Sequence, residues 1–210
     1  CPYGTEDERA MEYAHKVYPA LRNRMPEKFL EELNRSSRKS PVSSAMEYVQ
    51  WQRGAITRTP MPMMKAWVDT TAAGINIWLV LVIHGVDGIG WEALTSESLD
   101  EYFQYIRSKE NDLWVATFAD ATKYMRERMN AVVKTSGSKG KINITLTHSL
   151  DRSMYDVPLT LMTYVRPGWK EVIVKQGNEI KRLRTQQKGK ETYVLYQAVP
   201  NSENIEISGV

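Results

Sequence analysis

The sequence predicts an α/β section over residues 1–134 and an antiparallel β-sandwich over residues 141–210. Residues 77–83 form an apolar run that is too short to cross a membrane and too continuous for a half-exposed strand. Such a run is typical of a strand covered on both faces, as in parallel sheets. Helical and strand patterns alternate over residues 60–132, as in α/β proteins. Beyond residue 140, short alternating runs separated by turn residues replace the helical period.

Two helices are expected in the α/β section before the apolar run. Residues 5–16 follow Gly4 and carry acidic residues in the first turn, where the helix dipole favours negative charge. A second helix is expected to begin at residues 59–61, with a proline in its tolerated first turn, and to end near Gly74. Its apolar stripe is predicted to contain Met63, Met64, Trp67 and Val68.

After the apolar run, the pattern predicts a helix, a strand and a closing helix. Thr95 or Ser96 is expected to cap the helix, whose apolar residues recur at helical spacing: Leu99, Tyr102, Phe103 and Ile106. Residues 113–118 predict a second buried strand, and residues 120–132 predict the closing helix.

The composition changes at residues 135–140, Thr-Ser-Gly-Ser-Lys-Gly, which we expect to form a flexible linker. The strands predicted after it cover residues 142–147, 157–165, 171–175, 193–199 and 204–207. The tail also contains a basic cluster: Lys175, Lys181, Arg182, Arg184, Lys188 and Lys190. A solvated face, an edge strand protected by charge and a contact with glycan acids all remain open as explanations of this cluster.

Composition narrows the class of protein. The chain has 210 residues, 42% of them hydrophobic, which suffices for a real core. The net charge of +3 is spread along the chain and does not require nucleic acid or an anionic membrane as partner. The single cysteine, Cys1, excludes a disulfide within the chain, and no membrane-spanning segment is visible. Because the chain starts without methionine, we expect it to be a processed, truncated or excised product.

His84 is the strongest candidate for a functional residue. It ends the apolar run and faces a glycine-rich loop, residues 85–92, that contains Asp87, Trp91 and Glu92. In α/β proteins the carboxyl ends of strands and the following loops form the functional face. We therefore predict a site on this rim; the alternative is a hydrogen-bonded structural histidine beside a flexible loop.

Over residues 1–132 the sequence resembles the C-terminal part of the polysaccharide deacetylase family, which are metal-dependent carbohydrate esterases. The similarity is strongest over residues 78–128, where His84, Trp91-Glu92 and residues 113–118 recur in the family's order. Residues 2–3, Pro-Tyr, match the end of the family's Arg-x-Pro-Tyr motif. The resemblance implies the C-terminal part of a distorted (β/α) barrel, followed by an accessory β-sandwich.

The resemblance also implies a reaction, the removal of acetyl groups from N- or O-acetylated sugars by a metal-activated water. His84 would be catalytic as the general acid, and the main-chain N–H of Tyr3 would help to hold the oxyanion. The residues expected to contact the acetylated oligo- or polysaccharide are Val82, Asp87, Trp91 and Glu92.

The metal-binding half of the family's domain has no counterpart in the sequence. The three histidines, His15, His84 and His148, lie in different contexts and form no recognisable ligand set. We therefore expect zinc in the complete enzyme and no metal ligand in this chain. The missing half of the barrel would lie upstream in cis or in a second chain, and the enzyme would be extracytoplasmic: periplasmic, surface-bound or secreted. The alternative is a non-catalytic carbohydrate-binding or assembly module, in which the β-tail and Trp91 bind glycan.

Overall fold

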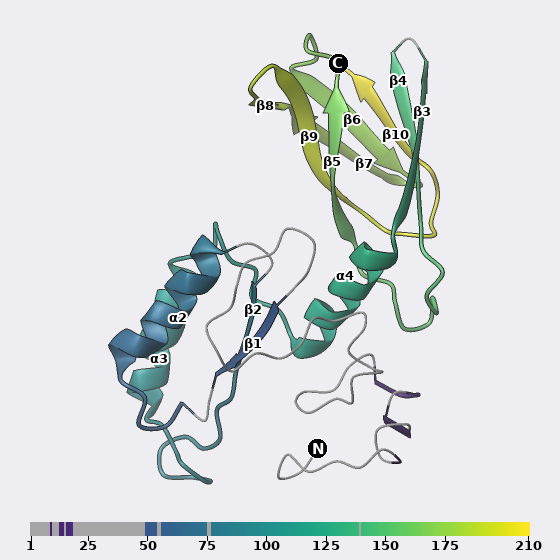
Figure 1. The fold of residues 1–210 in the computed structure, drawn as a ribbon. Coiled ribbons are helices and arrows are strands. Elements are labelled where there is room, and N and C mark those ends of the chain that lie inside the picture. Colours follow the sequence, from purple (N-terminus) through teal and green to yellow (C-terminus); the bar gives the residue numbers. More distant parts are fainter. Residues whose placement is uncertain are drawn as a thin grey trace. The chain divides into compact units, whose positions relative to one another are not determined.

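The computed structural model describes residues 9, 13, 14, 16–18, 49–53, 56–74, 77–138 and 140–210. The chain divides into two compact units, Cys1–Ala119 and Asp120–Val210 (Figure 1). The helix predicted at residues 5–16 lies mostly outside the described residues. Within the described part of the chain, no helix combines the length and the apolar character needed to cross a membrane.

The first unit contains a small parallel β-α-β arrangement. Strand β1 (Val49–Arg53) pairs in parallel with β2 (Ile77–Leu81), and helix α2 (Met61–Ala73) lies between them in sequence. Pro60 occupies the N-cap position of α2, where its missing N–H leaves no helical hydrogen bond unmade. The predicted helix is confirmed, with its end beside Gly74.

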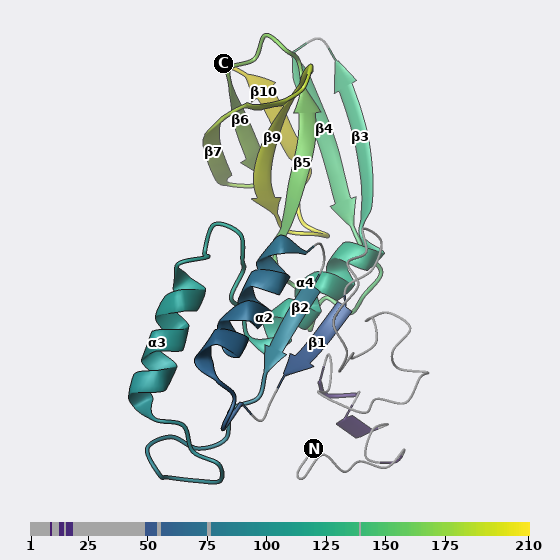
Figure 2. The same cartoon turned by 60° about the vertical axis from the view of Figure 1, so that its left-hand side comes forward.

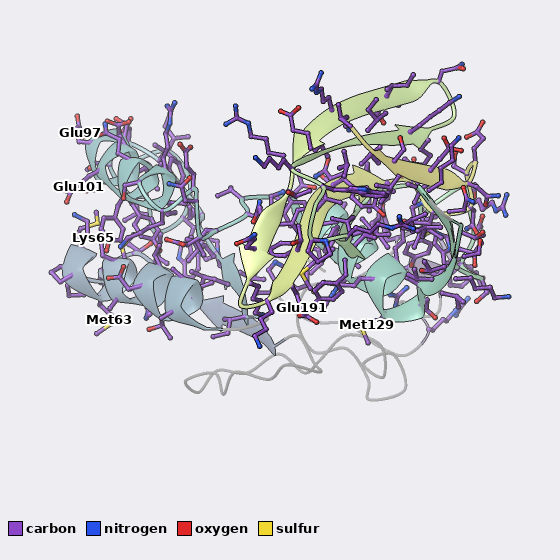
Figure 3. All side chains as sticks on the ribbon, turned by 90° about the horizontal axis from the view of Figure 1, so that it is seen from above. Met63, Lys65, Glu97, Glu101, Met129 and Glu191 are labelled. Atoms are coloured by element: carbon purple, nitrogen blue, oxygen red, sulfur yellow. The ribbon has the colours of Figure 1, made fainter. Side chains whose placement is uncertain are left out.

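The core of this unit lies between its two long helices and the sheet. Figure 2 shows α2 between the sheet and helix α3 (Ser96–Arg107). Met64 and Val68, four residues apart on α2, are buried together with Tyr102 of α3, whose hydroxyl donates to the carbonyl of Met64 at 3.1 Å. At the surface, Lys65 of α2 pairs with Glu101 of α3 at 2.7 Å (Figure 3).

Two of the predicted apolar stripes are only partly buried. Met63 and Phe103 are exposed, although the helical spacing predicted them to face the core. In the described part of the chain α2 packs mainly against α3 and β2, and α3 packs mainly against α2, so the rest of each helix surface, including Met63 and Phe103, faces solvent. Thr95 is confirmed as the N-cap residue of α3, since its hydroxyl accepts the N–H of Ser98 at 3.2 Å.

The predicted (β/α) barrel is wrong. The described part of the first unit contains one two-stranded parallel sheet, and the predicted strand at residues 113–118 is irregular until helix α4 (Phe118–Asn130) begins. Trp114 and Val115 are exposed instead of buried. A short apolar run carries no period that distinguishes a strand from an irregular segment, which is why the sequence misled here. In β2 itself only Val80 is buried, and the strand ends three residues before His84.

The second unit is an antiparallel β-sandwich, as the sequence predicted, and Figure 1 shows its two sheets face to face. The five-stranded sheet has the order β3 (Val132–Ser138), β4 (Lys141–Thr147), β10 (Ile205–Gly209), β6 (Glu171–Gln176), β7 (Glu179–Arg184). The three-stranded sheet has the order β5 (Leu159–Val165), β9 (Glu191–Ala198), β8 (Gln186–Lys188).

Alternation of burial along the strands defines the core of the sandwich. In β9 every second residue, beginning with Thr192, is buried, and the residues between them face outward. The hairpin between β6 and β7 is closed by Gly177, whose φ of 57° suits the first central position of a two-residue turn. The buried core residues are Ile144, Leu146, Leu159, Leu161, Val165, Val172, Val174, Val194, Tyr196, Ala198, Ile205 and Ile207.

The linker predicted at residues 135–140 is not a linker over its first four residues, which belong to β3. This strand pairs with β4 along its full length and lies at the edge of its sheet. Its residues 132–137 are all exposed, so the sequence shows no alternation that would reveal a strand. The predicted division into domains at residues 134 and 141 stays a prediction.

One polar pair is buried in the second unit. Glu127 of α4 is completely buried, and its Oε1 accepts the N–H of Val157 at 3.0 Å. Its Oε2 lies 3.5 Å from Nε2 of His148, which is also buried. Burial raises the pKa of the Glu127 carboxyl, whereas the Val157 N–H and the charge of His148 act to lower it. Asn201 completes the arrangement by accepting the main-chain N–H of His148 at 3.1 Å.

Candidate functional site

The structure brings His84 and Trp91 together at the surface of the first unit. Their ring centroids lie 4.6 Å apart, and the rings meet edge to face at 66°. Trp91 is 67% exposed, so one large aromatic surface remains open to solvent while the imidazole supports it from the side. The predicted pair of residues is therefore adjacent.

Main-chain hydrogen bonds hold the loop between these two residues in its conformation. Val86 donates to the carbonyl of Ile89 at 3.0 Å, and Leu94 donates to the carbonyl of Gly85 at the same distance. A Cβ on Gly85 would collide with the carbonyl oxygen of Ile89, so the loop closes only with glycine there. These bonds fix the position from which Trp91 projects.

The two predicted carboxylate residues hold the loop in place. Asp87 has a φ of 51°, and its Oδ1 accepts the N–H of Ser96 at 2.7 Å, at the start of α3. A carboxylate at this position satisfies a helix-terminal N–H and complements the helix dipole. The main-chain carbonyl of Glu92 accepts the hydroxyl of Thr57. Asp87 thus anchors the loop to a helix through its side chain, and Glu92 ties it to residue 57 through its backbone.

The remaining predicted site residues do not join this group as expected. Val82 is half-buried, and its main-chain carbonyl accepts the N–H of Ile56 at 3.2 Å. Tyr3 lies outside the described residues. Among the residues that the structure describes, no three or more His, Cys, Asp or Glu side chains are gathered as metal ligands. The expectation of zinc in a complete enzyme stays a prediction.

A second surface of interest lies on the outer side of the three-stranded sheet of the sandwich. Here the outward positions at the centre of β5 and β9 are apolar, in two cross-strand pairs. We define the tyrosine face as these outward side chains and their polar neighbours: Met162, Tyr164, Tyr193 and Leu195, with Thr160, Gln186 and Gln197.

The tyrosine face exposes large apolar side chains where a solvated sheet surface is normally polar. Tyr164 is 49% exposed, Met162 47% and Leu195 42%. The ring centroids of Tyr164 and Tyr193 lie 6.5 Å apart at 69°, and the Tyr193 hydroxyl donates to Oε1 of Gln186 at 2.9 Å. The rings are therefore held in a defined arrangement with amides beside them.

The sequence of β5 contains a pattern from which the tyrosine face could have been predicted. Residues 159–165 are apolar at both the inward and the outward positions, except for threonines at residues 160 and 163. A half-buried strand needs apolar residues on one side only. The second apolar side is therefore the feature to look for.

The chain is 28% identical over 154 residues to a gellan lyase from Bacillus sp, an alignment that covers 70% of this chain and 6% of the lyase. The chain thus spans only a small part of the length of that enzyme. No protein-family model matches the sequence, and no solved structure matches it.

These comparisons overturn the predicted family and reaction. No family model supports a polysaccharide deacetylase, and the curated protein that matches is named as a lyase, not as an esterase. The resemblance depended on short motifs around one histidine and two tryptophan-containing segments, and such motifs recur in unrelated folds. The general-acid role of His84 and the oxyanion role of Tyr3 came from that resemblance, and neither is retained.

Proposed function

We propose that this chain is a polysaccharide-binding section of a polysaccharide-degrading enzyme, with the tyrosine face as its binding surface. The single observation that carries the proposal is the cluster of exposed Tyr164, Met162 and Leu195 on one sheet face, with the ring of the half-buried Tyr193 beside that of Tyr164. The similarity to a gellan lyase supports a polysaccharide as the partner. The proposal assigns binding, not bond cleavage, to the described residues.

The chemistry of the tyrosine face suits a sugar polymer. One side of a pyranose ring presents C–H groups that pack on an aromatic or aliphatic surface, while its hydroxyls point outward from the ring edge. Tyr164 and Leu195 offer the apolar surface, and Gln186 and Gln197 offer amide donors and acceptors beside it. The same face thus supplies both kinds of contact that a sugar requires.

The size of the tyrosine face favours one polymer strand over a second protein. The side chains of Tyr164, Met162 and Leu195, each about half exposed, together present roughly 300 Å² of surface. A stable protein interface buries about 800 Å² on each partner. A patch of the observed size is large enough for a few sugar rings and too small for a stable dimer.

The His84–Trp91 pair supplies a second contact point in this proposal. Its exposed indole is fixed by a hydrogen-bonded loop, which reduces the conformational entropy lost when a ligand binds. Trp91 would stack on a sugar ring, and His84 would hold the indole in position. Because Asp87 is engaged at the start of α3, its role is to place the loop.

The proposal is tested by electrophoresis of the full chain in native gels cast with and without gellan. Wild-type protein should be retarded by the polymer. Tyr164→Ala should weaken binding about five- to tenfold, since one aromatic contact contributes about 1 kcal/mol. Tyr164→Phe keeps the ring and should bind nearly as wild type does.

Met129→Ala is the matched control, because Met129 is 46% exposed and belongs to α4, outside the tyrosine face. It removes a comparable apolar side chain and should leave retardation unchanged. Leu195→Gln is a second test of the tyrosine face that does not depend on the folding of the alanine variant, since it changes the polarity of the face at nearly constant side-chain size. A wild-type chain that gellan does not retard, or a Tyr164→Ala chain retarded equally, would overturn the proposal.

A further inference from the structure

The outer face of the five-stranded sheet is basic. In the registers of β3, β4, β6 and β7, five cationic residues occupy outward positions, and we call them the basic face: Lys134, Lys141, Lys175, Arg182 and Arg184. Only two acidic residues, Glu171 and Glu206, share the outward positions of the described strands. Positive charge therefore exceeds negative charge on this one surface.

The two acidic residues hold some of the cations in place without neutralising the face. Arg182 donates from Nε to Glu171 Oε2 at 2.8 Å, and Lys141 pairs with Glu206 at 2.9 Å. Arg184 lies 3.9 Å from Glu171, and its side chain is 91% exposed. Exposed ion pairs of this kind are weak and exchange readily for a ligand's carboxylate.

Topology, not sequence proximity, assembles this surface. The predicted basic cluster is divided by the fold, since Lys181 takes an inward position and pairs with Glu179, and Lys188 belongs to the other sheet. Lys134 and Lys141 join the face from a hairpin distant in sequence. Because adjacent strands lie about 4.8 Å apart, Arg182 and Lys141 are separated by about 14 Å across three strand steps.

Protection of a sheet edge does not account for the whole face. Strand β7 is an edge strand, so charge on Arg182 and Arg184 helps to prevent pairing with another chain. Lys141 and Lys175 lie on the interior strands β4 and β6, where no edge needs protection. Their positions require another explanation.

We infer that the basic face binds an acidic polysaccharide, one whose sugar rings carry carboxylates. The inference rests on the proposed function in taking the polymer to be a polysaccharide, and it adds the class of sugar. Carboxylates repeated along a chain would meet cations spread over several strands, and the sugar hydroxyls would meet outward polar groups between them: Asn143, Thr145 and Ser208.

The chemistry of a lyase agrees with this class of polymer. Elimination breaks a C–O bond after a proton leaves the neighbouring carbon, and a carboxylate attached to that carbon makes its proton more acidic. A module that retains an acidic polymer would keep such a substrate near an enzyme of this type. The positive face supplies the charge complementarity that retention requires.

The test compares two polymers with the same sugar backbone, polygalacturonate and its uncharged methyl ester, with the full chain at 25–200 mM NaCl. The wild type should bind the acid form more tightly, and its affinity should fall as salt rises. A variant with Lys134→Gln, Lys175→Gln and Arg184→Gln should bind the acid form about tenfold more weakly, from the loss of three exposed charge contacts. Its affinity for the methyl ester should not change.

The matched control carries Arg152→Gln, Lys170→Gln and Lys190→Gln, three exposed cations in turns of the same unit. It has the same net charge as the test variant and should bind the acid form as wild type does. Equal loss in both variants, equal wild-type affinity for the two polymers, or tighter binding of single-stranded DNA than of polygalacturonate would overturn the inference. Tyr164→Ala separates the two proposals, because it should weaken binding of the methyl ester whether or not the basic face binds acid.

Discussion

Replacing Glu127 with alanine should destabilise the sandwich unit, and replacing it with glutamine should not. The Glu127 side chain is completely buried and accepts the N–H of Val157 at 3.0 Å. Alanine removes that acceptor and also the neighbour of the buried His148 ring. Glutamine keeps a carbonyl oxygen for Val157 and nearly the same volume.

The expected size follows from these contacts. A buried N–H left without a partner costs about 1–3 kcal/mol. Removing the side-chain methylene and carboxyl groups leaves a cavity whose cost is about 1 kcal/mol or more. Because alanine also removes a buried charge that is unfavourable without full pairing, we expect a net loss of about 2–3 kcal/mol in the free energy of unfolding. Glutamine should stay within about 1 kcal/mol of wild type.

The pH dependence of the same pair of proteins gives an independent check. Because burial raises the pKa of Glu127 in the folded state, its contribution to stability is fully present below the ordinary value of 4.5 and is lost as pH rises through the folded value. Glutamine does not titrate. The stability of the wild type relative to Glu127→Gln should therefore fall as the pH is raised from 4.5 toward neutrality.

Urea denaturation measures the global effect, and amide hydrogen exchange at Val157 measures it locally, independently of how the first unit unfolds. In Glu127→Ala the exchange of this amide should accelerate by one to two orders of magnitude. An alanine variant as stable as wild type, with unchanged protection at Val157, would refute the assignment of this carboxyl as a structural acceptor.

Three further predictions concern the first unit. Thr95→Ala should lower the free energy of unfolding by about 1 kcal/mol through loss of the α3 cap, and Thr95→Ser should restore it, as measured by denaturation; equal effects of both changes would contradict the capping role. Gly85→Ala should shift the fluorescence emission of Trp91, because the Cβ of the new alanine meets a carbonyl oxygen and disturbs the loop. An unchanged emission spectrum of Trp91 would argue against this. Burial raises the pKa of Tyr102 to about 12, so this phenol should titrate above the ordinary phenol value of 10.0 in an absorbance titration, and its stabilising effect should be lost as pH rises from 10 through 12. The wild type should therefore form one more phenolate than Tyr102→Phe only as the pH approaches about 12, and a difference that is already present near pH 10 would count against the raised pKa.

The elements with a regular apolar period were predicted well from the sequence. The strands of the sandwich with buried alternate residues, such as β9, were predicted within a few residues of their bounds. The helices were predicted from apolar spacing and from caps such as Thr95. The exposed edge strand β3 was missed, and an edge strand at β7 was only one of the open explanations of the basic cluster, since neither strand needs apolar residues facing a core along its length.

The α/β prediction failed because a local apolar run does not specify the layer that covers it. Residues 77–83 and 113–118 have the composition of buried strands, yet the first is largely half-buried in a two-stranded sheet and the second is irregular. Burial depends on partners distant in sequence, which these segments alone do not encode. The barrel then followed from a resemblance that the comparisons do not support.

The candidate surfaces show the same division between local and assembled features. His84 and Trp91, seven residues apart, could be paired by inspection because one short loop joins them. The tyrosine face and the basic face are assembled by cross-strand registers, for example Tyr164 with Tyr193. A register is set by turns and core packing together, so these faces become visible only in the folded chain.

The most direct test of the central claim is a nuclear magnetic resonance titration of the full chain with gellan oligosaccharides, followed through backbone amides and tyrosine rings. The account predicts that the largest shifts gather on β5 and β9 around Tyr164 and Tyr193, with the buried core residues of the same strands shifting least. No saturable shift on the tyrosine face, while the protein remains folded, would contradict it.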